Sequence, residues 1–170
     1  MDLTNYEKYR PLMKTGDTLL YKRRNFFSWL IRLFSPGFNH ASIVIRFNEY
    51  NGQKDRVWTL EAELPGVILT FLSRSLARFK GSVWWYPLKD EFNCKRESIG
   101  LFILEQSGKP YDFRSLFKNI FGRVNAEIRA IFCSELNFLA YKEAGILSGN
   151  IAPRPGDIPS WNIFKTPVKL

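Results

Sequence analysis

The chain has 170 residues, and its composition of 45% hydrophobic and 24% charged residues excludes disordered, collagen-like and coiled-coil proteins. At ~100–200 residues per domain, this length predicts one domain over 1–170. A net charge of +9 favours anionic partners. Because no apolar run approaches the ~20 residues of a membrane span and no secretory signal is visible, we expect a cytoplasmic protein.

The predicted elements alternate between short strands and helices, in the pattern of an α+β fold with an antiparallel sheet. Residues 1–16 and 153–170 are expected to be an arm and an ordered coil at the two ends of the chain. Gly145 stands where a glycine commonly ends a helix. In chain order, a strand is predicted at 18–22, a helix at 25–34, strands at 41–47, 57–63 and 67–70, a helix at 72–79, a strand at 82–87, and helices at 91–106 and 132–144.

Three side chains in these elements carry acid–base or nucleophilic groups. His40 is the single histidine and directly precedes a buried strand, and alternation along the next strand places Glu61 beside it on one sheet face. Cys133 begins the last predicted helix, where free N–H groups and the helix dipole would stabilise a thiolate and an oxyanion. Together they could form a set of nucleophile, base and orienting carboxylate.

Each of these residues also has a purely structural interpretation. A buried cysteine is most often a small inert hydrophobe, and a carboxylate on a strand can simply face solvent. Glu63 lies on the same predicted face as Glu61, so the carboxylate partner is open between the two. Cys94 has no acid–base neighbour in the sequence, and we interpret it as structural.

The ordered motifs of the chain resemble the circularly permuted branch of the NlpC-type papain-like cysteine amidases, which includes lecithin retinol acyltransferase relatives. In that branch the cysteine helix comes last. The resemblance implies an antiparallel sheet or small barrel packed against helices, with the catalytic cysteine at the N-terminus of a C-terminal helix. Its matching segments are Gly16-Asp17-Thr18-Leu19-Leu20, Phe38-Asn39-His40-Ala41-Ser42-Ile43-Val44, Glu61-Ala62 with Gly66-Val67, Gly108-Lys109-Pro110-Tyr111-Asp112, and Phe132-Cys133-Ser134-Glu135-Leu136.

The resemblance also implies a role for each matched residue. Cys133 would be the nucleophile, His40 the general base, and Glu61 the residue that orients the imidazole. Tyr111 and Ser134 would contribute to the substrate or oxyanion site, with the backbone N–H of Cys133 as the favoured oxyanion donor. The implied activity is hydrolysis of an amide, isopeptide or acyl substrate through an acyl-enzyme, without metal or cofactor.

Two other classes of function remain open. The first is a lipid-directed acyltransferase or thioesterase-like enzyme at an anionic membrane surface, contacted through Lys22, Arg23 and Arg24 beside the apolar segment 25–34. The second is a basic nucleic-acid or membrane binding module without catalysis. Nucleic acid is not favoured as a partner, because the chain has no RRM, KH, helix-turn-helix or zinc signature.

Overall fold

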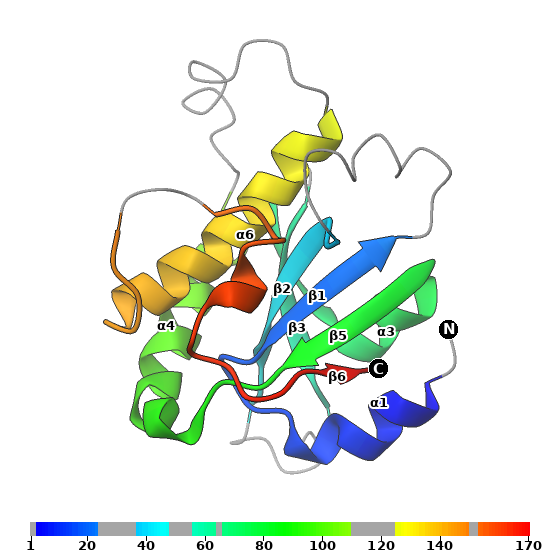
Figure 1. The fold of residues 1–170 in the computed structure, drawn as a ribbon, viewed down its shortest axis with the longest axis horizontal. Coiled ribbons are helices and arrows are strands. Elements are labelled where there is room, and N and C mark those ends of the chain that lie inside the picture. The colour runs from blue at the N-terminus through cyan, green and yellow to red at the C-terminus, as the bar shows by residue number, and fades with distance from the viewer. Residues whose placement is uncertain (1–2, 24–36, 48–55, 64–65, 110–124, 150–152) are drawn as a thin grey trace.

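The computed structural model describes residues 3–23, 37–47, 56–63, 66–109, 125–149 and 153–170, without the side chains of Arg23, Glu63 and residues 125–132. These ranges form an α+β fold in which a six-stranded antiparallel sheet packs against helices (Figure 1). The strand order is β4-β3-β2-β1-β5-β6, so the sheet is open. The strands are β1 (Thr18–Arg23), β2 (His40–Ile45), β3 (Trp58–Glu63), β4 (Gly66–Phe71), β5 (Gly81–Tyr86) and β6 (Val168–Lys169).

The side chains of the strands alternate between two buried clusters, one on each face of the sheet. Ile43 and Leu60 face the cluster that contains α4 and α6, whereas Val44 and Val57 face the cluster that contains α1 and α3. This burial confirms the alternation predicted for residues 57–63. The helical segments are α1 (Thr4–Tyr9), η1 (Arg10–Leu12), α3 (Leu72–Arg78), η2 (Asp90–Lys95), α4 (Arg96–Gln106), α6 (Asn125–Glu143) and η3 (Ile158–Ser160).

The helices of the chain differ from the sequence-based prediction at three places. The N-terminal arm contains α1 and η1, because Tyr6 and Met13 bury their side chains in the cluster on that face. Residues 91–106 divide into η2 and α4. The predicted start of the last helix at residue 132 is wrong, because α6 already begins at Asn125.

The early start of α6 has a local cause in the sequence. Residues 125–131, NAEIRAI, contain no glycine or proline, and their two alanines, glutamate and arginine are strong helix formers. Nothing in this segment therefore stops the helix before it reaches Cys133. The predicted helix at 25–34 lies outside the described residues, as does Arg24, whereas Lys22 is exposed in β1. No described helix is long and apolar enough to cross a membrane.

Asp17 lies at the centre of a buried polar cluster at the start of β1. Its carboxylate accepts hydrogen bonds from the backbone N–H groups of Lys14 and Leu88 and from the indole of Trp85. The guanidinium of Arg96 completes the set at 2.8 Å. The Gly16-Asp17 motif therefore ties the first strand to β5 and to α4, and its role in the described structure is architectural.

Replacing Asp17 by asparagine should destabilise the protein strongly. Asp17 is 1% exposed, and its loss of charge would leave the Arg96 guanidinium buried against a neutral group. Removing one partner of a buried ion pair typically costs about 3–5 kcal/mol. We expect the free energy of unfolding, measured by urea denaturation, to fall by about that amount. Replacing the exposed Asp90, whose partner Lys165 is also exposed, by asparagine is the matched control and should leave the free energy of unfolding nearly unchanged.

Candidate active site

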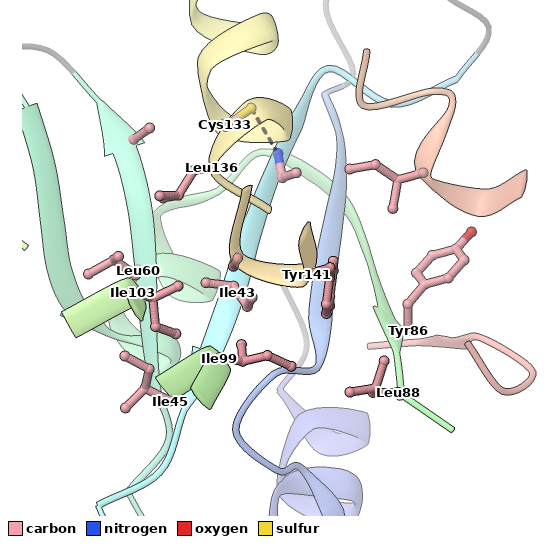
Figure 2. Close-up of a cluster of buried hydrophobic side chains, with 14 of the residues drawn as sticks. Ile43, Ile45, Leu60, Tyr86, Leu88, Ile99, Ile103, Cys133, Leu136 and Tyr141 are labelled. Carbon is pink, nitrogen blue, oxygen red and sulfur yellow. Dashed lines mark hydrogen bonds between the residues drawn. The ribbon is translucent and has the colours of Figure 1, made fainter. Parts of the chain in front are cut away.

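Cys133 is positioned by the face that α6 turns toward the sheet. Among the α6 side chains that the structure describes, which begin at Cys133, the buried residues of this face follow the helical spacing i, i+3, i+4, i+7, i+8 and i+11. Figure 2 shows the thiol above the apolar cluster that contains Ile43, Leu60 and Leu136. The buried stripe consists of Cys133, Leu136, Asn137, Ala140, Tyr141 and Ala144.

Polar contacts fix the position of this helix along the sheet. The hydroxyl of Tyr141 donates to the backbone oxygen of Gly16 at 2.7 Å, and Thr18 Oγ1 donates to Asn137 Oδ1 at 2.9 Å. The side-chain amide of Asn137 in turn donates to the backbone oxygen of Cys133 at 2.8 Å. Since α6 is attached at these points to the first strand, the height of Cys133 above the sheet is set by tertiary contacts.

The prediction that Cys133 stands at a helix N-terminus is wrong. The residue lies eight positions after Asn125, well inside α6. Only the first four N–H groups of a helix lack an intrahelical partner. The backbone N–H of Cys133 is therefore not an available oxyanion donor, and the dipole argument, which holds for the first turn, does not apply to its thiol.

A strand amide takes the place of the helix terminus. The pairing of β2 with β3 ends at Ile43 and Leu60, so Ala41 has no β3 partner in the described structure. The N–H of Ala41 donates to Cys133 Sγ at 3.2 Å, and Figure 2 marks this hydrogen bond with a dashed line. This hydrogen bond is buried, so water does not compete with the sulfur for the Ala41 N–H.

His40 is the first residue of β2, where it pairs with β1 and lies beyond the described pairing of β2 with β3. Its Nε2 is 3.1 Å from Glu61 Oε2. The next residue, Ala41, contacts Cys133 Sγ through its N–H, although α6 covers the opposite face of the sheet from α3. The contact between His40 and Glu61 that the strand alternation predicts is present. The side chain of Glu63 lies outside the described residues.

The surroundings of His40 favour its protonated form. Burial is the largest single influence and lowers the pKa of His40, but four other interactions together outweigh it. These are the charge of Cys133, the hydrogen bonds to Cys133 and Glu61, and the charge of Glu61, which raise the pKa of His40 from 6.5 to about 10. At neutral pH the imidazole is thus a cation beside the Glu61 carboxylate.

Glu61 is held from its other side by a residue that sequence reasoning missed. Ser75, on α3, donates its hydroxyl to Glu61 Oε1 at 2.7 Å. The sequence segment 72–79 predicts only a short basic helix, and a serine on such a helix gives no signal of its own. Its distance of 14 positions from Glu61 is spanned by the β3–β4 hairpin, so only the folded chain brings the two together.

Tyr21 also belongs to the site. Its ring lies 4.9 Å from the imidazole of His40, centroid to centroid, and its hydroxyl is 3.1 Å from Ser42 Oγ. Burial, followed by the charge of Glu61, raises the pKa of Tyr21 well above its usual value of 10. The phenol therefore stays neutral and packs against His40 without adding a second negative charge.

The remaining predicted site residues are less directly placed. The hydroxyl of Ser134 donates to the backbone oxygen of Pro153, so its proton already takes part in a hydrogen bond within the protein. Tyr111 lies outside the described residues, and its role stays a prediction. Cys94 is exposed on η2. Among the described residues, no group of three or more histidine, cysteine or acidic side chains is arranged to hold a metal ion.

Comparison with protein-family models and with curated proteins gives no match for this chain. The resemblance to the permuted papain-like amidases therefore stays a prediction from the sequence motifs. The geometry of Cys133, His40 and Glu61 is an independent observation, because it comes from the folded chain.

Proposed function

We propose that the protein is a cysteine-dependent hydrolase that acts through Cys133, His40 and Glu61. The observation that carries the proposal is the position of His40, whose Nε2 is 3.1 Å from Glu61 Oε2 and whose neighbour in the chain, Ala41, donates its N–H to Cys133 Sγ at 3.2 Å. Nucleophile, base and orienting group within hydrogen-bond reach of one another are the signature of nucleophilic catalysis. A buried cysteine with a merely structural role would need neither the imidazole nor the carboxylate behind it.

In the proposed reaction, the Cys133 thiolate attacks the carbonyl carbon of the substrate and forms a tetrahedral intermediate. His40, as imidazolium, donates its proton to the leaving amine or alcohol, and the bond to that group breaks to give a thioester on Cys133. Neutral His40 then takes a proton from water, the hydroxide adds to the thioester carbonyl, and the carboxylic acid leaves as the thiolate is restored. Glu61 keeps the imidazole in one orientation and stabilises its charge.

The chemistry of the thioester step is compatible with several classes of substrate. Amides, isopeptides and esters or thioesters of fatty acids all pass through the same acyl-enzyme, and attack by an alcohol or amine in place of water would make the enzyme an acyltransferase. Cys133 is fully buried, whereas the His40 side chain is 20% exposed. The carbonyl group would therefore approach from the side of His40.

Labelling with electrophilic acyl probes tests this function and the substrate class together. The probes are peptidyl, amino-acyl and fatty-acyl electrophiles of equal reactivity, and mass spectrometry identifies the modified residue. We expect the acyl group on Cys133, with one class of probe reacting faster than the others, and no labelling of Cys133 in the His40→Ala variant. The exposed Cys94 is the internal control. Labelling of Cys94 while Cys133 stays unmodified would contradict the proposal.

A further inference from the structure

The carboxylate of Glu61 is fixed at both of its oxygens. Oε2 contacts His40 Nε2 at 3.1 Å, and Oε1 accepts the hydroxyl of Ser75 at 2.7 Å. The Glu61 side chain is only 6% exposed, so little water is available to satisfy it. A carboxylate that accepts a hydrogen bond at each oxygen cannot rotate about its last bond without breaking both.

Ser75 is itself held on a firmly packed element. Leu72 and Leu76, on either side of it in α3, are fully buried among the apolar residues of that face. The N–H of Leu72 donates to the backbone oxygen of Val57, which joins the start of α3 to the residue before β3. The helix that carries Ser75 is therefore attached to the strand that carries Glu61, and the separation of the two side chains is set by this packing.

The hydroxyl groups of Tyr21, Ser42 and Thr59 form a cluster on the same face of the sheet. The hydroxyl of Tyr21 lies 3.1 Å from Ser42 Oγ, and Thr59 Oγ1 donates to Ser42 Oγ at 2.6 Å. None of these groups carries charge, and in the described structure Ser75 is the side chain that donates to Glu61 Oε1. The orientation of the carboxylate toward His40 thus depends on one neutral hydroxyl.

We propose that Ser75 is a positioning residue that acts through Glu61 to hold the imidazole of His40 toward Cys133. This role rests on the proposed hydrolase function, and it adds a fourth residue, from a different layer of the fold, to the three that carry the chemistry. A hydrogen bond to a charged group contributes more than one between neutral groups. Loss of the Ser75 hydroxyl should therefore lower kcat by about tenfold and leave KM nearly unchanged.

The first experiment measures turnover of 4-nitrophenyl acetate by Ser75→Ala and Ser75→Thr. Threonine keeps the hydroxyl and should restore most of kcat, whereas Ser73→Ala, on the same helix, is the matched control and should leave kcat unchanged. When Ser75→Ala is added to Glu61→Ala, no further loss is expected, because the serine acts only through that carboxylate. Full kcat in Ser75→Ala, or a loss that adds to that of Glu61→Ala, would overturn the proposal.

The second experiment needs no activity. His40 is the single histidine, so its Nε2–H proton gives one assignable NMR signal when the hydrogen bond to Glu61 protects it from exchange with water. Ser75→Ala should broaden this signal or remove it, and Ser75→Thr should retain it. An unchanged signal in Ser75→Ala would refute the positioning role. If wild-type protein shows no turnover but the signal responds as expected, the hydrolase function fails and the Ser75 contact stands.

Discussion

Replacing Cys133 by alanine or serine should reduce turnover by roughly 10⁴-fold or more, and His40→Ala should do nearly the same. In the proposed mechanism the nucleophile and the base act as one unit, so the loss of either would remove the acylation step, and the double variant should be hardly worse than each single one. Turnover of 4-nitrophenyl acetate and of the best acyl substrate, measured in the steady state, checks this result.

The two Cys133 variants separate catalysis from folding. Alanine removes the sulfur that accepts the N–H of Ala41, and an unpaired buried amide costs about 1–3 kcal/mol. Serine retains an acceptor and should keep more of the free energy of unfolding, although its hydroxyl is a far weaker nucleophile. Cys94→Ala changes an exposed thiol and should leave both activity and stability unchanged. Wild-type turnover in Cys133→Ser would exclude the proposed mechanism.

Glu61→Gln should lower the pKa of His40 toward its ordinary value of 6.5. The variant removes a negative charge 3.1 Å from the imidazole and weakens the hydrogen bond to it, and both interactions raise the pKa of His40 in the wild type. NMR titration of the single histidine measures the effect directly. The alkaline limb of kcat/KM, which reports loss of the His40 proton, should move to lower pH by the same amount.

The free energy of unfolding should depend on the same protonation of His40. Because the pKa of His40 is raised on folding, its contribution to the free energy of unfolding is fully present below pH 6.5 and is lost as the pH rises toward about 10. In Glu61→Gln this loss should be complete at a lower pH. An unchanged His40 titration in that variant would show that Glu61 does not act on the imidazole.

Much of the secondary structure could be predicted from local sequence signals. The β-branched run of β2 and the strict alternation of β3 identify two neighbouring strands and assign Leu60 and Glu61 to opposite faces. Gly145, with φ +70°, ends the last helix where the sequence predicts the end. The start of that helix is mispredicted because the helix formers of residues 125–131 are overlooked, and an error of seven residues moves Cys133 from the middle of α6 to a helix N-terminus.

The sequence by itself determined the α+β class, the face of β3 that carries Glu61, and His40 as the single histidine of the chain. These follow from alternation and composition, which are local or additive properties. Only the tertiary structure decided which group donates to the Cys133 thiol and which residue holds Glu61. The amide of Ala41 is available because the pairing of β2 with β3 ends before it, and Ser75 reaches Glu61 because α3 packs beneath the same strands. Contacts of this kind depend on where strands separate and on how the helices pack against the sheet. Neither can be predicted from a single segment of the sequence.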